Sequence, residues 1–191
     1  MKAVVLNGAG KGDHATDAVH GILRDELSGI GCEVESFTLR ELEISPCLGC
    51  FGCWVQTPGV CVIRDVGRDV ARAIIRSDLA VFLTPVTFGG YSSELKKALD
   101  RSIGLVSPFF TRVKGEIHHK PRYPRHPRLI GVGVLAKPDP ESERIFTSLV
   151  NRNAINFFTP AHAAGVVLSG EGTDRVREKV ASLIAAVGAR R

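Results

Sequence analysis

The stretch Lys2-Ala-Val-Val-Leu-Asn7, continued by Gly8-Ala-Gly-Lys-Gly-Asp-His-Ala-Thr16, decides the fold of this chain. Its first half is a short apolar run typical of a buried strand, and its second half is a glycine-rich turn that opens a helix over 17–30. Glycines let the backbone approach a ligand, and the first turn of a helix presents unpaired N–H groups to an anion. The stretch therefore predicts a phosphate site, helped by Lys11 and Thr16, with a ligand-free turn as the alternative.

The turn differs from two better-known phosphate loops. A Walker loop needs Gly-Lys-Ser/Thr, and the dinucleotide fingerprint counted from Gly8 meets Asp13 where its third glycine should stand. The sequence therefore favours a phosphate site of another type, at the carboxyl end of the first strand.

The same alternation of apolar runs and helix-period segments continues along the chain and predicts a parallel sheet with helices on both faces. The expected strands are 2–7, 33–39, 78–85, 129–135 and 163–168, and the expected helices are 17–30, 65–76, 93–103, 140–156 and 173–187. Two irregular stretches remain: a cysteine-rich loop at 41–64 and a basic, proline-rich arm at 108–128. Loops of this length inside a domain usually carry function.

The composition is that of an ordinary globular protein. The 191 residues fit a single domain over 1–191, with 44% hydrophobic and 24% charged residues. No apolar run approaches the roughly 18 residues that a membrane span needs, and the first run is too short for a signal peptide. We therefore expect a cytoplasmic protein without membrane contact, in which cysteines are more often ligands or catalytic thiols than disulfides.

Four cysteines form a C-x2-C-x2-C-x7-C run: Cys47, Cys50, Cys53 and Cys61. Ferredoxin-like runs space thiolates two residues apart so that they converge on one iron–sulfur cluster, with the fourth supplied from further along. Structural zinc usually takes two separated C-x2-C pairs. The spacing favours a cluster, and zinc or cysteines packed as small hydrophobic side chains stay open as alternatives. Cys32 lies outside the run and is expected to be buried.

Three motifs in this order resemble one known family. The turn Asn-Gly-x-Gly-x-Gly-x-x-x-Thr after the first strand is similar to the start of flavodoxin-like NAD(P)H-dependent FMN reductases. The stretch 84–97 is similar to the isoalloxazine loop of that family, and the cysteine run resembles its iron–sulfur flavoprotein branch. One departure is that Ala9 and Gly10-Lys11 stand where the family has Ser and Pro-Arg, which replaces a bidentate guanidinium by a point charge. Weaker phosphate affinity is expected.

The resemblance implies a flavodoxin-like, doubly wound α/β fold: a five-stranded parallel sheet of order 2-1-3-4-5 in three layers, α/β/α, with FMN at its carboxyl edge. The FMN phosphate is expected on the first loop and the ring system along the second, where backbone N–H groups of 87–90 would bond the ring edge. The residues expected to bind FMN are Gly8, Ala9, Gly10, Lys11, His14, Ala15 and Thr16 in the first loop, and Thr84, Pro85, Val86, Thr87, Phe88, Gly89, Gly90 and Tyr91 in the second.

The resemblance also implies the activity, an NAD(P)H-dependent oxidoreductase of FMN or quinone reductase type. NADPH or NADH would donate to FMN, and electrons would pass through a [4Fe-4S] cluster on Cys47, Cys50, Cys53 and Cys61 to a small-molecule or protein acceptor. No catalytic acid or base is required, because the chemistry belongs to the cofactors. A homodimer or homotetramer is expected. The alternative is a non-enzymatic electron-transfer flavoprotein that carries electrons between protein partners.

The net charge of +5 is concentrated in the basic arm. Against Glu116 alone, 111–128 contains six basic residues: Arg112, Lys114, Lys120, Arg122, Arg125 and Arg128. Such a patch indicates a local anionic partner, such as nucleotide phosphates or an acidic protein surface, with a solvated loop as the alternative. It lacks aromatic interleaving beyond Tyr123 and has no recognition-helix pattern, so no nucleic-acid partner is expected. Prolines at every third position from 121 to 127 favour extended, polyproline-like backbone.

Overall fold

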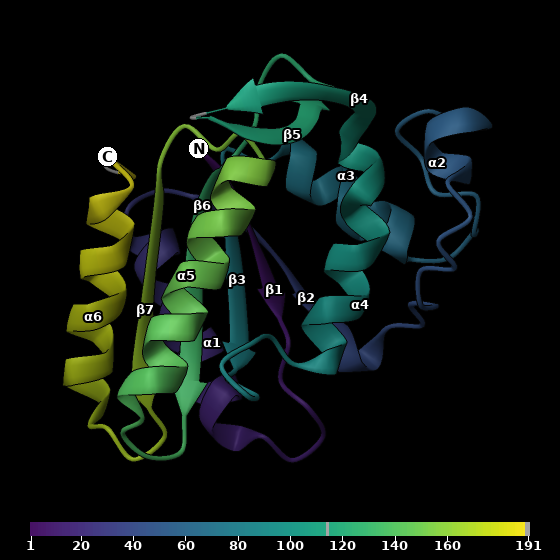
Figure 1. Ribbon diagram of the computed structural model, residues 1–191. Helices are drawn as coiled ribbons and strands as arrows, with labels where there is room; N and C mark the ends of the chain where they lie inside the picture. The colour runs from purple at the N-terminus through teal and green to yellow at the C-terminus, as the bar shows by residue number, and fades with distance from the viewer. Residues whose placement is uncertain (114, 190–191) are drawn as a thin grey trace.

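The computed structural model describes residues 1–113 and 115–189 and has an α/β fold built on a five-stranded parallel sheet (Figure 1). Each of its strands lies within one residue of the bounds predicted from the apolar runs. The strands are β1 (Lys2–Asn7), β2 (Glu33–Thr38), β3 (Leu79–Pro85), β6 (Arg128–Leu135) and β7 (His162–Leu168). They lie in the order β2-β1-β3-β6-β7, with every neighbouring pair parallel.

This order differs from the expected 2-1-3-4-5, because the described residues form two strands that the sequence analysis did not predict. These are β4 (Val106–Val113) and β5 (Glu116–Pro121), which pair only with each other as an antiparallel hairpin. The hairpin replaces the first part of the expected irregular arm, and Lys114 of that arm lies outside the described residues. Figure 1 places the hairpin beyond the amino edge of the sheet, opposite the loops that follow β1 and β3.

Helices cover both faces of the sheet, since successive strand residues point to opposite sides. Val5 packs in the core formed with α1 and α6, whereas Val4 and Leu6 pack in the core formed with α3, α4 and α5. The helices are α1 (His14–Gly29), α2 (Gly52–Val55), α3 (Gly67–Arg76), α4 (Ser93–Arg101), α5 (Pro140–Asn156) and α6 (Thr173–Ala186), with 3₁₀ turns η1 (Leu39–Glu41) and η2 (Ser102–Leu105). Among the described residues, no helix combines the length and apolar character needed to cross a bilayer.

The segment between β2 and α3, which carries the cysteine run, is fastened to α4 by a buried ion pair. The side chain of Arg101 is 0% exposed, and its guanidinium donates two hydrogen bonds of 2.8 Å to the carboxylate of Asp65. Its N–H groups also donate to the carbonyls of Ser45 (2.8 Å) and Ile63 (3.3 Å). Asp65 in turn accepts from the N–H groups of Ser45 and Gly67. One ion pair therefore closes both ends of the cysteine segment onto α4.

The carboxylate of Asp65 is held in its charged form. Burial raises the pKa of Asp65, but the hydrogen bonds from Arg101 and Ser45 outweigh it and lower the pKa to about 2, from an ordinary 3.8.

We expect Asp65→Asn to lower the free energy of unfolding by about 3–5 kcal/mol at neutral pH, because it leaves Arg101 buried without a counter-charge. Since the folded-state pKa of Asp65 is depressed, the advantage of the wild type should be full above about pH 4 and lost as the pH falls toward 2. Urea titrations of both proteins across this range measure the difference. A stability difference between the two proteins that stayed constant down to the lowest pH would contradict the lowered pKa of Asp65.

Candidate functional site

The loops that follow β1 and β3 meet at the carboxyl edge of the sheet. The N–H of Gly8 donates to the carbonyl of Leu83 (2.8 Å), and the hydroxyl of Ser92 donates to the carbonyl of Gly8 (2.6 Å). A Cβ on Gly8 would lie 2.8 Å from Cβ of Leu95 and 2.9 Å from Oγ of Ser92. Only glycine fits this junction, which brings the predicted residues of 8–16 and of 84–91 together.

The first loop presents unpaired backbone N–H groups to open space. Within residues 1–113 and 115–189, the N–H groups of Gly10, Lys11 and Gly12 donate to no protein acceptor. A Cβ added to Gly10 or Gly12 would meet no atom within 4 Å. Because Lys11 is exposed beside these amides, the loop fits an anion such as a phosphate. Ala9, by contrast, is buried, and its N–H donates to the side chain of Asn7.

Asp13 accepts a hydrogen bond from the hydroxyl of Thr16, which the sequence analysis assigned to the phosphate. Its two carboxylate oxygens accept from the N–H (3.0 Å) and the hydroxyl (2.6 Å) of Thr16, which is fully buried. Asp13 is an N-cap residue, so α1 begins at His14, three residues before the predicted start. His14 and Ala15 lie in the first turn. Among the described residues, the loop amides and Lys11 remain available to an anion.

The second loop forms a tight turn with an aromatic tip. Thr87 and Gly90 exchange two backbone hydrogen bonds of 3.0 and 2.8 Å, so these two amides are used within the loop. Phe88 and Gly89 at the tip have φ of 50° and 75°, and the side chain of Phe88 is fully exposed. Thr84 is buried below the turn and accepts from the N–H of Ser92. Of the amides predicted to meet the flavin ring, those of Phe88 and Gly89 have no acceptor among the described residues.

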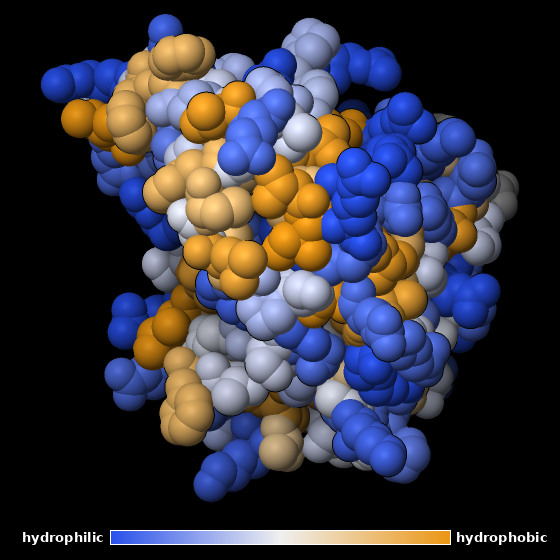
Figure 2. Space-filling view, turned by 90° about the vertical axis from the view of Figure 1, so that its right-hand side faces the viewer, coloured by the Kyte–Doolittle hydropathy of each residue, from blue (hydrophilic) through white to orange (hydrophobic). Residues whose placement is uncertain are grey.

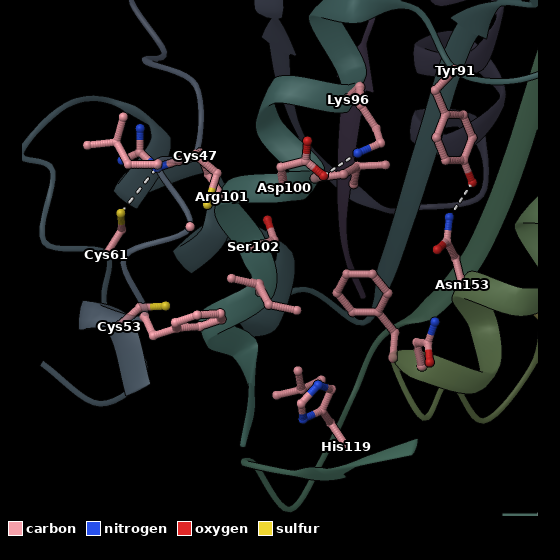
Figure 3. A pocket seen from close by; sticks show the side chains of 18 of the residues that line it. Cys47, Cys53, Cys61, Tyr91, Lys96, Asp100, Arg101, Ser102, His119 and Asn153 are labelled. Atoms are coloured by element: carbon pink, nitrogen blue, oxygen red, sulfur yellow. Dashed lines mark hydrogen bonds and ion pairs between the residues drawn. The ribbon is translucent and has the colours of Figure 1, made fainter. Parts of the chain in front are cut away.

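A cavity of about 720 Å³ lies between the cysteine segment, α4 and α5 (Figure 3). Figure 3 shows labelled cysteines on one side of it and Tyr91 and Asn153 on the opposite side. Nδ2 of Asn153 donates to the hydroxyl of Tyr91 (2.8 Å), and burial raises the pKa of Tyr91 to about 12. Apolar side chains complete the wall: Leu99, Ile103, Val106, Leu149 and Phe157. The cavity therefore connects the last residue of the second loop with the cysteine run.

All four cysteines of the run line this cavity: Cys47, Cys50, Cys53 and Cys61. Burial raises the pKa of the Cys53 thiol, and the three other thiols add to the effect. Four thiols on one cavity are the donor set of an iron–sulfur cluster or of zinc. In the part of the chain that the structure describes, however, no three His, Cys, Asp or Glu side chains are assembled as a metal site. The ligand set stays a prediction. Cys32 is buried in the core on the α1 side, as predicted.

Helix α4 links the two halves of the site. It begins beside the first loop, where Ser92 caps it by accepting from the N–H of Leu95 (3.2 Å). It ends at Arg101, whose Nε donates to Sγ of Cys61 (3.2 Å). A helix of nine residues is about 13 Å long. Figure 1 places α2 of the cysteine segment beside the end of α4 that lies away from the two loops.

A row of aromatic rings joins the cysteine segment to the hairpin. Phe51 stacks on Trp54 (centroids 5.3 Å apart), Trp54 contacts His119 (4.9 Å), and His119 contacts Phe110 (4.8 Å). Nε1 of Trp54 also donates to the carbonyl of Val106 (3.0 Å). Trp54 therefore packs against the hairpin. Its hairpin partners were missed because no local pattern signals that β4 and β5 pair.

Sequence comparison identifies a matching family and several named relatives. The profile of the NADPH-dependent FMN reductases matches residues 1–123. An iron–sulfur flavoprotein of Methanocaldococcus jannaschii is 32% identical over 117 residues, which is 60% of this chain and 58% of that protein. An iron–sulfur flavoprotein of Archaeoglobus fulgidus is 31% identical over 104 residues, 54% of this chain and 46% of that protein. The chain thus spans about half the length of the curated relatives it matches.

Solved structures share the fold over nearly the whole chain. An NAD(P)H:quinone oxidoreductase from Methanothermobacter marburgensis superposes with a TM-score of 0.64 at 13% identity, covering 99% of this chain and 96% of that one. An FMN-dependent NADH-azoreductase from Bacillus anthracis, solved in complex with FMN, superposes with a TM-score of 0.66 at 11% identity, covering 100% of this chain and 99% of that one. At such identities these likenesses show the fold alone. The profile match, which covers well over half of the sequence, shows that the chain belongs to the NADPH-dependent FMN reductase family.

Proposed function

We propose that this chain binds FMN where the loops after β1 and β3 meet, and that it reduces the flavin with NADPH or NADH. The observation that carries the proposal is the junction at Gly8, which puts a loop of unpaired amides next to the turn of Phe88 and Gly89. In doubly wound sheets such crevices at the carboxyl edge hold nucleotides. Family membership, and fold neighbours named as quinone, azo and FMN reductases, support the same activity.

The phosphate of FMN would be held by the backbone N–H groups of Gly10, Lys11 and Gly12 and by the ammonium group of Lys11. These donors have no partner within the described residues, whereas the hydroxyl of Thr16 donates to Asp13. With one point charge and no guanidinium, the loop should bind FMN less tightly than loops that carry Pro-Arg.

The flavin ring would lie along the second loop, where the N–H groups of Phe88 and Gly89 remain to bond its polar edge. When bound, FMN supplies a ring that accepts a hydride and can pass electrons on singly. The residues of the chain orient the ring and shield it from water, and the exposed side chain of Phe88 is placed to cover it. No side-chain acid or base is needed, in keeping with a site built from backbone groups.

The four cysteines that line the cavity would hold a [4Fe-4S] cluster, which would supply one-electron transfer to a small-molecule or protein acceptor. The compact spacing and the shared cavity support this, as does the likeness to proteins named iron–sulfur flavoproteins. Because the sulfurs are not already assembled as a metal site, loading should require that the exposed part of the cysteine segment closes around the cluster.

The surface supports self-association. Figure 2 shows apolar side chains gathered on the side of the molecule that carries α2. Large apolar residues are exposed both in the cysteine segment and in the hairpin that it contacts: Leu48, Phe51, Val55, Phe109, Phe110 and Ile117. Exposed groups of this kind usually mark an interaction surface. A homodimer or homotetramer that covers them is our proposal for the assembly, and a cytoplasmic location stays a prediction.

The flavin half of the proposal is tested with Lys11→Gln. Loss of the ammonium group should weaken FMN binding by about tenfold or more, because a hydrogen bond to a charged group contributes about 1.5–3 kcal/mol. Quenching of FMN fluorescence during titration measures the dissociation constant. Lys2→Gln is the matched control, since Lys2 is exposed at the opposite edge of the sheet and should leave the affinity unchanged. Equal FMN affinities of the wild type, Lys11→Gln and Lys2→Gln would show that the phosphate does not bind to this loop.

The reductase activity is tested by anaerobic stopped-flow mixing of the FMN-loaded protein with NADPH and, separately, with NADH. We expect one of the nucleotides to bleach the flavin absorbance at a saturable rate, because the family match predicts a nicotinamide-dependent reduction. Free FMN mixed with the same nucleotide is the control. No bleaching above that control with either nucleotide would favour a carrier of electrons over a reductase.

The cluster half is tested by comparing Cys50→Ala with Cys32→Ala. Wild-type protein isolated without oxygen should contain about four iron and four acid-labile sulfide per chain. Cys50→Ala should lose both, whereas Cys32→Ala should keep both, since Cys32 is buried in the core away from the cavity. Iron and sulfide analysis gives the result. Iron-free wild type that still binds FMN would refute the cluster and leave the flavin proposal standing.

A further inference from the structure

We propose that Arg101 is the positioning residue for the sulfur of Cys61, which it holds toward the cavity as a metal ligand. Its Nε donates a hydrogen bond of 3.2 Å to Sγ of Cys61 (Figure 3). The inference rests on the proposed metal centre of the cysteine run. It assigns to Arg101 a role in metal binding that is separate from its ion pair with Asp65.

The direction of this hydrogen bond is fixed by the rest of the guanidinium. Nη1 donates to Asp65 and to the carbonyl of Ser45, and Nη2 donates to Asp65 and to the carbonyl of Ile63. A guanidinium is planar, so these bonds set the plane in which the Nε–H group points. With the side chain 0% exposed, Arg101 cannot turn away into solvent. The sulfur of Cys61 therefore accepts a hydrogen bond from an N–H group of Arg101 whose direction is fixed.

The hydrogen bond from Arg101 favours a metal-bound sulfur at this place. Arg101 and Asp65 together form a neutral pair, and the remaining partners of the guanidinium are uncharged carbonyls. A thiolate or a cluster sulfur adds negative charge directly at the donor. Hydrogen bonds to the sulfurs of a cluster are among the factors that set its reduction potential, and partners of this kind also orient the ligands. Arg101 should therefore tighten metal binding and favour the reduced, more negative cluster.

Arg68 provides a matched comparison within the same turn. Its Nε donates to the carbonyl of Cys61 (2.7 Å) and its Nη2 to the carbonyl of Val62 (3.1 Å). Arg68 from α3 and Arg101 from α4 thus both contact Cys61, Arg68 at its carbonyl and Arg101 at its sulfur. Because Arg101 also fastens the segment through Asp65, a purely structural role predicts that the metal affinity of each variant falls in step with its free energy of unfolding. A role at the sulfur predicts that the metal affinity of the Arg101 variants falls beyond this trend.

The first experiment titrates the metal-free protein with Co²⁺, whose absorption in complexes with thiolates reports ligation by cysteine. We expect roughly 10–100-fold weaker binding in Arg101→Lys, as for other residues that orient metal ligands, and a change below threefold in Arg68→Lys. The double variant Asp65→Asn/Arg101→Gln removes the donor without burying an unpaired charge, and it should match Arg101→Lys. Urea unfolding of each variant verifies that it is folded. Equal weakening by the Arg68 and Arg101 variants, or unchanged affinity in both, would overturn the inference.

The second experiment poises the reconstituted iron–sulfur protein at a fixed solution potential. Arg101→Lys should lower the ratio of reduced to oxidised cluster about tenfold, equivalent to about 59 mV for one electron, and Arg68→Lys should not. If the wild type binds Co²⁺ through thiolates but takes up no iron and sulfide, the cluster proposal fails and the role of Arg101 stands on the cobalt affinities. If the cluster loads and neither its ratio nor the cobalt affinity changes in Arg101→Lys, the role of Arg101 fails and the cluster stands. No cobalt–thiolate absorption in the wild type would overturn both.

Discussion

The contact between Gly8 and Ser92 is the constraint on which the rest of the site depends. At the end of β1 the pairing with β3 reaches Asn7 and Leu83, and Gly8 extends it by one more hydrogen bond. Ser92 then ties the carbonyl of Gly8 to the first turn of α4, which it also caps. Because a Cβ at Gly8 would clash with both Ser92 and Leu95, the first loop and α4 can approach this closely only at a glycine.

The position of the cysteine segment follows from that junction. Helix α4 is fixed at its start by Ser92 and carries Arg101 at its end, where the pair with Asp65 fastens the segment. The loops after β1 and β3 and the thiol-lined cavity are therefore placed by a single short helix. The cavity reaches from Cys61 to Tyr91 along this helix, so groups at its two ends share one apolar space.

The sheet and its long helices could be predicted from the sequence because the central strands β1, β3 and β6 are buried on both faces and read as continuous apolar runs, such as Leu79–Pro85. The hairpin of β4 and β5 could not be predicted in this way. Strand β4 contains a proline at 108 and an irregular register between Val106 and Phe110, and much of it is exposed, so no alternation of polar and apolar residues marks it. Its contact with Trp54 arises only from tertiary packing.

In the candidate site, the two loops could be predicted from their residues. The hydrogen-bond partners of individual side chains could not, because polar groups of the protein compete with a ligand for them. Thr16 was predicted to bind a phosphate, yet its hydroxyl donates to the carboxylate of Asp13, three residues earlier in the chain. Arg101 lies in a helix with Lys96 and Asp100, which pair with each other at its surface, and it looks like a further solvated charge. It is buried because a segment distant in sequence folds over it, and such burial has no local signature.

The position of Trp54 makes the contact between the cysteine segment and the hairpin observable by fluorescence. It is the only tryptophan of the chain, and it lies between Phe51 of the cysteine segment and His119 of the hairpin. All indole emission of the molecule therefore originates at the seam where these two segments touch. The protein carries an intrinsic fluorophore whose wavelength and lifetime report on that seam alone.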